Sequence, residues 1–341
     1  MNLQREFKSA FFQTWVNEGL PDTARYEASY LHHLAAIHCP FMKSNHISAK
    51  SDALHPELLK RVYGFGHLVG QTIGILLGIP KGAAAKRAEW CAKFNLGISL
   101  FDYCCDEAKE GAFVEKLPAL RAFASPTEPT ERAHRVSTPL HKLLNQIASE
   151  VLQSVADEVG GLASNAAQHY LWKAMAKMYC AELHLSKLEV TTKVDLKRLK
   201  SSVRFKSSEP FRVMAVWMAL GDPRTKREPA RSKTAGALGG ALGDCFWLVD
   251  DAMDVWLDFE AGQWNYFLIV AAEDDPSLFA NPRDAMLASR MTQLWDRSRV
   301  PQETARRVVR RFSKAISVLP KTPKATEALG LIGASLARWS C

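Results

Sequence analysis

The chain has 341 residues and carries 44 Lys and Arg against 36 Asp and Glu, which leaves a formal net charge of +8. Charged residues make up 23% of it and hydrophobic residues 47%, a composition typical of globular proteins that excludes disordered and low-complexity classes. The seven cysteines form no CxxC pair, so the sequence indicates neither a zinc ribbon nor a disulfide framework.

Membrane and nucleic-acid functions are not expected. The longest apolar runs, such as 71–80, are shorter than the roughly 20 residues that cross a bilayer. The first residues lack the apolar core and cleavage site of a signal peptide, so we expect a soluble, cytoplasmic protein. The positive charges are scattered and accompany no zinc-finger or RNP-like pattern, and a small anionic substrate also fits a basic chain.

Apolar residues repeat at intervals of three to four along most of the chain, which is typical of amphipathic helices. The clearest such stretches, in chain order, are 58–69, 90–101, 140–151, 171–178 and 308–319. The alternation typical of strands is almost absent. Gly and Pro residues separate the helical stretches by short links. We therefore predict an all-α protein, one domain over 1–341, with roughly ten helices around a central apolar cavity.

A first acidic cluster ends the apolar stretch 90–101. Asp102 and Asp106 are four residues apart, so they share one face of a helix about one turn apart. Two stacked carboxylates repel each other, and a divalent cation would relieve the repulsion. The alternative is an acidic, solvated helix end.

A second acidic cluster lies inside an apolar, aromatic stretch. Asp250 and Asp254 fall on one helical stripe with Gly243, and Asp251 flanks it. Carboxylates among apolar side chains need a cation or a proton to offset the loss of hydration. Oxygen ligands from two helices, shared with a phosphate, are the usual environment of magnesium in proteins.

Together the two clusters resemble the class I isoprenoid synthases, which comprise trans-polyprenyl diphosphate synthases and the terpene synthases built on the same fold. The resemblance runs from about residue 83 to the C-terminus and is densest over 206–265. The segment 234–243, leading into 250–254, resembles a helix pair near the end of the family's fold. The resemblance implies that three Mg²⁺ ions hold the diphosphate of a prenyl diphosphate substrate. Their ligands would be Asp102, Asp106, Asp250, Asp251 and Asp254. Lys206, with Arg204 as the weaker candidate, stands where the family's lysine contacts that diphosphate.

The departures from the family pattern favour a reaction with one substrate. Tyr103 replaces the second aspartate of the first motif, and Trp247 replaces a glutamine that precedes the second. The Gly-Lys-x-x-Arg segment that holds isopentenyl diphosphate is missing from the N-terminal third. The tail formed by Gly262, Asn265 and Tyr266 looks more like that of terpene synthases.

The resemblance thus implies a terpene synthase, a lyase that ionises farnesyl or geranylgeranyl diphosphate and cyclises or quenches the cation. Two alternatives remain open: a chain-elongating prenyltransferase with an unusual second-substrate site, and a silent regulatory subunit of the same fold. A homodimer would fit the resemblance. The aromatic residues expected at the cavity wall, each of which could equally be ordinary core, are Phe94, Phe101, Tyr103, Trp217 and Trp247. The basic stretch 224–233 is expected to be a solvated connection or to fold over the substrate diphosphate.

Overall fold

The computed structural model describes residues 3–43, 55–106, 138–162, 165–185, 188, 195–226, 230–279 and 286–340. These residues form twelve α-helices and three short 3-10 helices and contain no strand, which confirms the predicted all-α fold. The α-helices are α1 (Leu3–Asn17), α2 (Glu27–Ala36), α3 (Pro56–Leu76), α4 (Lys81–Asp106), α7 (Pro139–Leu162), α8 (Asn165–Leu185), α9 (Leu196–Leu220), α10 (Ala230–Ala261), α11 (Tyr266–Asp274), α12 (Leu287–Ser298), α13 (Val300–Ile316) and α14 (Pro323–Trp339). The 3-10 helices are η1 (Thr23–Tyr26), η2 (Pro40–Lys43) and η4 (Pro223–Lys226).

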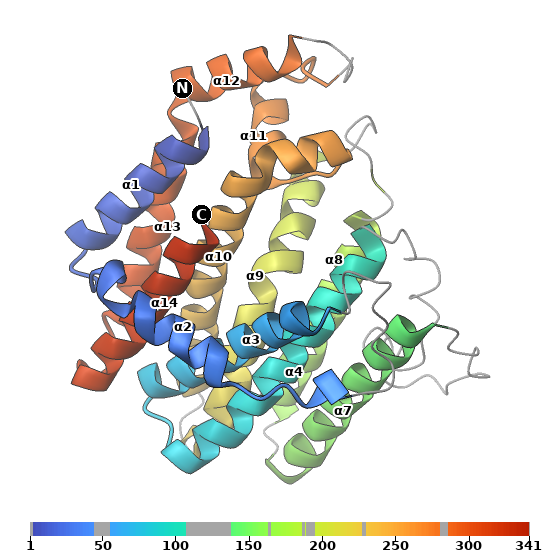
Figure 1. Ribbon diagram of the computed structural model, residues 1–341, viewed down its shortest axis with the longest axis vertical. Coiled ribbons are helices and arrows are strands. Elements are labelled where there is room, and N and C mark those ends of the chain that lie inside the picture. Colours follow the sequence, from blue (N-terminus) through green and yellow to red (C-terminus); the bar gives the residue numbers. More distant parts are fainter. Residues whose placement is uncertain are drawn as a thin grey trace.

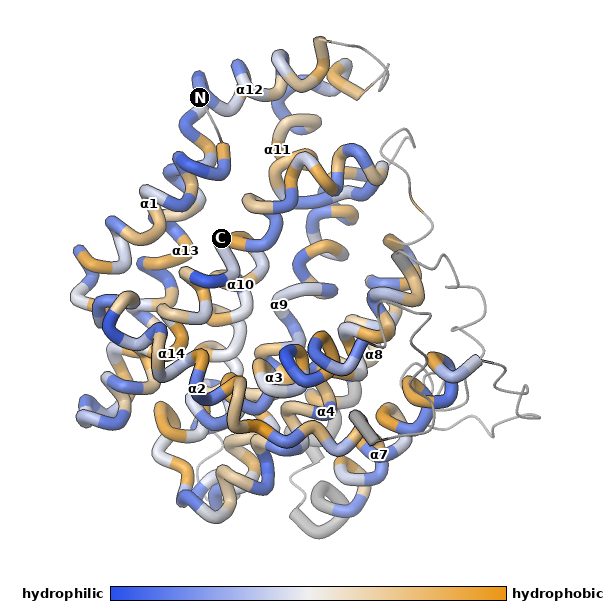
Figure 2. The backbone as a smooth tube through the Cα atoms, in the orientation of Figure 1, coloured by the Kyte–Doolittle hydropathy of each residue, from blue (hydrophilic) through white to orange (hydrophobic). Residues whose placement is uncertain are grey.

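The periodic stretches of the sequence form helices, as their apolar spacing of three to four residues predicts. Four of them lie inside α3, α4, α7 and α8, and the fifth runs three residues past the end of α13. Hydrophobic and hydrophilic residues alternate along most helices (Figure 2). Local signals fix several starts: Pro56 begins α3, and the Asp195 side chain accepts hydrogen bonds from the first backbone N–H groups of α9.

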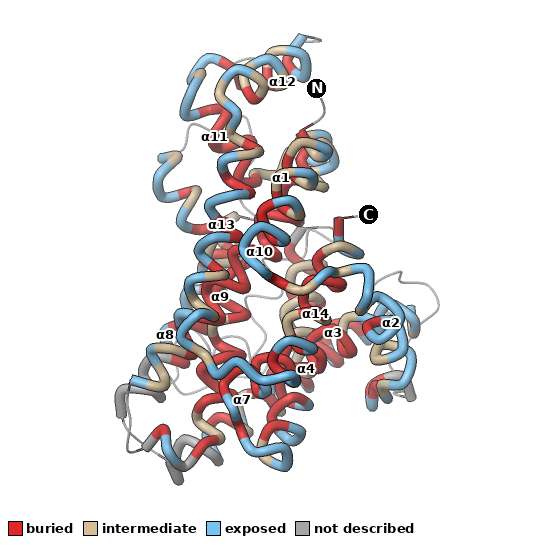
Figure 3. Tube along the Cα trace, turned by 90° about the vertical axis from the view of Figure 1, so that its left-hand side faces the viewer, coloured by how far each residue is buried: buried red, intermediate tan, exposed pale blue. Residues whose placement is uncertain are grey.

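Helices α9 and α10 form the centre of the molecule, and buried residues are concentrated along them and along α3 and α4 (Figure 3). Glycines on α10 allow the two central helices to approach closely. A Cβ at Gly239 would lie 2.5 Å from the backbone oxygen of Phe211, and one at Gly243 would lie 2.4 Å from that of Ser208. The glycine-rich sequence therefore sets the separation of the two helices that carry Lys206 and Asp250.

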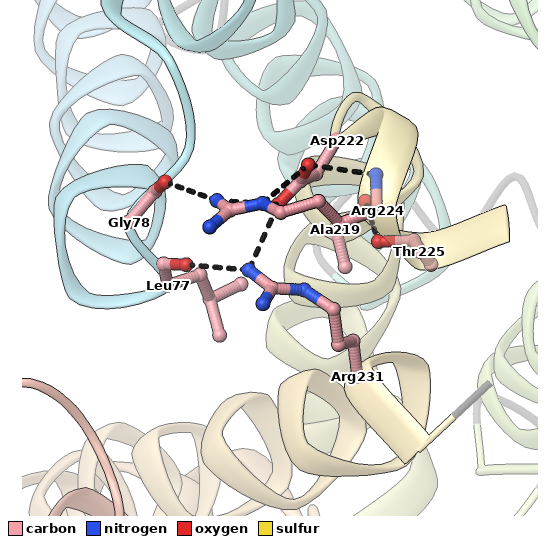
Figure 4. Close-up of polar contacts among 7 residues, drawn as sticks. All are labelled: Leu77, Gly78, Ala219, Asp222, Arg224, Thr225 and Arg231. Atoms are coloured by element: carbon pink, nitrogen blue, oxygen red, sulfur yellow. Dashed lines mark hydrogen bonds and ion pairs between the residues drawn. The ribbon is translucent and has the colours of Figure 1, made fainter. Parts of the chain in front are cut away.

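The turn between α9 and α10 is held by a buried carboxylate (Figure 4). Asp222 accepts hydrogen bonds from Arg224 and Arg231, whose guanidinium groups also donate to the carbonyl oxygens of Gly78 and Leu77. These contacts tie the turn to the end of α3. Arg224 and Arg231, two cations of the basic stretch 224–233, therefore stabilise the turn rather than contact a substrate. Residues 227–229 lie outside the described residues.

A continuous hydrophobic core extends from α1 to α14, with the N-terminal α1 packed beside α13 (Figure 1). None of the helices in the described part of the chain has the length and hydropathy needed to span a bilayer.

Candidate active site

A cavity of about 370 Å³ opens between α3, α4, α8, α9, α10 and α14. Its wall is unusually acidic. The carboxylates that line it are Asp102, Glu182, Asp250, Asp251, Asp254 and Asp258. Among the described residues that line this cleft, Lys206 is the one cation. The structure therefore brings Asp102 of the first acidic motif, the aspartates of the second motif and the predicted lysine to one space.

Lys206 on α9 bridges two acidic side chains of neighbouring helices. Its Nζ lies 2.6 Å from Asp102 Oδ1 on α4 and 3.3 Å from Glu182 Oε1 on α8. Glu182 is buried, whereas the Asp102 side chain is 44% exposed. The lysine thus lies at the boundary between the buried and the open part of the cleft, with its charge partly balanced.

Three aspartates of α10 form one acidic stripe. Asp250, Asp254 and Asp258 follow one another at intervals of four residues, so they lie on the same helical face. The pKa of Asp250 is raised to about 7, chiefly by burial and also by the charges of Asp254, Asp258 and Asp102, against a lowering hydrogen bond from Trp339. Burial also raises the pKa of Asp254. Burial and mutual repulsion destabilise the negative charge of these carboxylates, and a bound cation would offset both effects.

Asp251, on the flank of this stripe, also lines the cleft and anchors the next helix. Its Oδ2 accepts a hydrogen bond of 2.6 Å from the Tyr266 backbone N–H and one of 2.9 Å from Trp247 Nε1. Asn265 caps α11 and donates to the Asp251 carbonyl oxygen and to Asp258. The tail that follows the second motif therefore fixes the position of the acidic stripe.

Of the predicted site residues, Arg204 lies outside the cleft, and the side chain of Asp106 is not described. Arg204 lies on the opposite side of α9, where its guanidinium pairs with Asp244, 3.1 Å from Nε to Oδ1. We therefore do not place Arg204 on the substrate diphosphate. Asp106 is the last residue of α4, and its side chain lies outside what the structure describes.

The donor set of the cleft suits a hard divalent cation. Carboxylate oxygens from α4 and α10 face one space, and their mutual repulsion raises the pKa of Asp250 beyond the effect of burial. In the described part of the chain, no three His, Cys, Asp or Glu side chains already converge as metal ligands. Binding would therefore require Asp102, now paired with Lys206, and the carboxylates of α10 to reorient.

Aromatic side chains line another part of the cleft. Phe65 packs against Phe246 and Trp339, with ring centroids 5.1 and 4.8 Å apart, and Phe211 stacks on Phe246 at 5.0 Å. Trp339 Nε1 donates a hydrogen bond of 2.6 Å to Asp250 Oδ1. Aromatic rings therefore reach as far as the acidic stripe.

A smaller apolar pocket between α4, α7 and α8 adjoins the cleft, sharing Ile98, Glu182 and Lys206 with it. Phe94 and Phe101, which were expected at the cavity wall, line this pocket, and Trp247 lines the cleft. Trp217 instead belongs to the core, stacked on Trp90. Tyr103 lines neither space.

Three cleft residues were not predicted as site residues from the sequence. Asp258 continues the four-residue spacing of the second motif, so that spacing could have identified it. The sequence alone does not decide whether Glu182 is a buried polar anchor or a cavity group. Trp339 is 89 residues from its partner Asp250, and no local pattern links the two.

A scan against protein-family models and a search of curated proteins give no match to this chain. Solved structures do match. A geranylgeranyl pyrophosphate synthase from Lactobacillus brevis is 15% identical, with 96% of this chain and 99% of that chain covered and a TM-score of 0.52. A polyprenyl synthase from Caulobacter crescentus, complexed with calcium and isoprenyl diphosphate, is 14% identical over 93% and 97%, with a TM-score of 0.53. A geranylgeranyl pyrophosphate synthetase from the archaeon Geoglobus acetivorans is 16% identical over 91% and 97%, with a TM-score of 0.53.

These similarities extend over nearly the whole of each chain at low sequence identity. The chain therefore has the isoprenoid synthase fold, as the resemblance of its two acidic motifs predicted.

Proposed function

We propose that the protein is a magnesium-dependent enzyme acting on prenyl diphosphates. More specifically, we propose a class I terpene synthase that ionises one linear allylic diphosphate, farnesyl or geranylgeranyl diphosphate. One observation carries the proposal: aspartates of α4 and α10 and Lys206 of α9 line one cleft, which continues into aromatic and apolar walls.

Asp102, Asp250 and Asp254 would hold the magnesium ions, with Asp106 contributing from the end of α4. Asp251 positions the stripe through its hydrogen bonds with Tyr266 and Trp247. Bound magnesium would supply Lewis-acid stabilisation of the leaving diphosphate. The Caulobacter crescentus synthase, whose structure holds calcium and isoprenyl diphosphate, supports the choice of a divalent cation and of this substrate class.

The chain's own residues orient the substrate for ionisation. Lys206 gives up its contact with Asp102 and donates to the diphosphate, which places the allylic carbon toward the aromatic part of the cleft. The C–O bond breaks with its electron pair passing to the diphosphate. The cation then either loses a proton to give a hydrocarbon, or adds water and loses a proton to give an alcohol, with or without ring closure. Apolar walls keep bulk water away from the cation, and the faces of Phe65, Phe246 and Trp339 stabilise its charge.

The charge of the cleft favours one substrate over two. Chain elongation needs a second diphosphate site, which is built from cations. Lys206 is the single cation on the cleft wall within the described ranges. Candidates in the N-terminal third lie elsewhere: Arg87 is buried, donates to the Trp217 carbonyl oxygen and stacks over the Trp217 ring, and Lys60 donates to the Ala35 carbonyl oxygen.

A chain-elongating prenyltransferase is the second candidate, favoured by the fold comparisons, because the three solved structures described above are prenyl diphosphate synthases. A silent regulatory subunit is the third, and it is disfavoured because Asp102, the aspartates of the second motif and Lys206 line the same cleft.

Incubation of the full chain with magnesium and either farnesyl or geranylgeranyl diphosphate tests the proposal. We expect release of inorganic diphosphate together with a hydrocarbon or terpene alcohol. Release should stop in excess chelator. No turnover of either substrate, with the folded protein and magnesium present, would favour the regulatory subunit.

A further inference from the structure

A second cavity, of about 380 Å³, lies on the other side of α10 from the cleft, where α9, α10, α11 and α13 meet. Its volume falls in the range of roughly 300–1,000 Å³ typical of small-molecule sites. Its charged lining residues are Lys197, Lys200, Arg204, Asp244, Arg307 and Arg311. Five of these residues are cations and one is a carboxylate.

Helical spacing places the cations on two facing walls. Lys197, Lys200 and Arg204 lie on one face of α9 at intervals of three and four residues. Arg307 and Arg311 are four residues apart on α13. Lys197 and Lys200 also lie near the N-terminus of α9, where positive charge opposes the helix dipole. The arrangement is therefore unfavourable for the helix itself, and a bound anion would compensate for it.

The guanidinium groups are held in place by the floor of the cavity. Asp244, almost fully buried, accepts hydrogen bonds from Nε and Nη2 of Arg204 and pairs with Arg311. Arg307 Nη2 donates a hydrogen bond of 2.7 Å to the Tyr266 hydroxyl. These contacts restrain the long side chains before any ligand arrives, so less conformational entropy is lost on binding.

Lys200 also has an aromatic and an acidic contact, with Tyr266 and Glu273. Lys200 Nζ lies over the Tyr266 ring and 2.7 Å from Glu273. Counting Asp244 and Glu273 against the five cations leaves a local excess of positive charge among the described residues. We propose that this cavity binds a phosphate-type anion without a metal ion. The ligand is inorganic phosphate or diphosphate, or the phosphate of a lipid headgroup.

The two cavities differ in charge and share only Trp247 among their described lining residues. The cleft is acidic and would hold a diphosphate through magnesium, whereas the second cavity is basic and needs no metal. Anion binding measured in excess chelator therefore reports on the second cavity and not on the cleft. The inference does not depend on the reaction proposed for the cleft.

The test is calorimetric titration of the full chain with inorganic diphosphate, and separately with inorganic phosphate, in excess chelator. We expect one site per chain. Arg307→Gln and Lys197→Gln each remove a charge-assisted contact and should weaken binding roughly tenfold. Arg306→Gln, an exposed neighbour of Arg307 that does not line the cavity, is the matched control and should bind as the parent does. Lys206→Ala, in the cleft, should also leave this affinity unchanged.

A parallel flotation assay distinguishes the source of the phosphate. Vesicles of phosphatidylcholine alone are compared with vesicles containing phosphatidic acid. Binding of diphosphate without vesicle binding assigns the cavity to a free anion. Vesicle binding that Arg307→Gln and Lys197→Gln weaken assigns it to a headgroup. Absence of binding in every arm, or binding that Lys206→Ala abolishes and the cavity variants leave intact, would overturn the proposal.

Discussion

Lys206 on α9 and Asp102 on α4, which are 104 positions apart in the sequence, form an ion pair with Nζ and Oδ1 2.6 Å apart. The pair joins the residue proposed to bind the substrate diphosphate to one proposed to bind magnesium. Without ligand, each neutralises the other. Metal and substrate would therefore have to separate them, and the two binding events should assist each other.

Lys206→Gln should weaken the binding of substrate and of inorganic diphosphate in the presence of magnesium by roughly 10- to 100-fold. The reason is the loss of one charge-assisted contact, of about 1.5–3 kcal/mol. Inhibition by inorganic diphosphate, measured together with the Michaelis constant, checks this. Lys60→Gln, outside the cleft, is the control. An unchanged inhibition constant would mean that Lys206 only pairs with its carboxylate neighbours.

Asp250→Asn and Asp254→Asn should each lower turnover by more than roughly 100-fold, because metal ligation supplies several kcal/mol of charge stabilisation. An asparagine oxygen can still accept the Trp339 hydrogen bond, and removing one of several like charges should not destabilise the fold. Steady-state kinetics and thermal unfolding together check the prediction. Asp274→Asn, at the exposed end of α11, should retain parental activity. A magnesium-dependent parental rate in either cleft variant would contradict the assignment.

Gly243→Ala should lower the free energy of unfolding by about 1–3 kcal/mol. Its Cβ would lie 2.4 Å from the Ser208 carbonyl oxygen and would push α10 away from α9. Gly82→Ala is the matched control, since a Cβ at that helical position meets nothing within 4 Å. That variant should be neutral or stabilised by up to about 1 kcal/mol. Equal urea midpoints for the two variants would show that the close approach is dispensable.

Stability should fall as the pH drops from about 6.5 toward 4. His33 Nε2 lies 3.3 Å from His67 Nδ1, and burial, with the charges of His67 and His32, lowers the pKa of His33 to about 4. Burial also lowers the pKa of His67. Between these pH values the unfolded chain binds more protons than the folded one, so protonation favours unfolding.

We expect a loss of roughly 1–2 kcal/mol over this pH range, less than the full shift because His33 is partly exposed. His33→Gln should reduce the loss, and His38→Gln, exposed beyond the end of α2, should not. Thermal unfolding at several pH values measures both. A pH dependence that is the same in the two variants would rule out the His33–His67 pair as its source.

The helices could be predicted because their signals are local. The apolar spacing of 58–69 and 90–101 and the prolines at helix starts required no knowledge of tertiary contacts. The two acidic motifs were predictable in the same way, since a spacing of four residues defines a helical face.

Contacts between distant segments were not predictable. Arg204 and Lys206 are two residues apart, so helix geometry requires them to point in different directions, but only the packing of α9 shows which one faces the cleft. Trp339 reaches Asp250 through the docking of α14, which no local pattern encodes. The basic cavity likewise needs α9 and α13 to pack against the same part of α10.

The measurement that tests the central claim most directly supplies the protein with magnesium, an allylic diphosphate and labelled isopentenyl diphosphate. The cleft wall, with Lys206 as its one cation among the described residues, predicts that the label stays in unreacted isopentenyl diphosphate. The allylic substrate should still be converted to a hydrocarbon or terpene alcohol and inorganic diphosphate. Efficient transfer of the label into a longer prenyl diphosphate would contradict the account and establish a chain-elongating prenyltransferase.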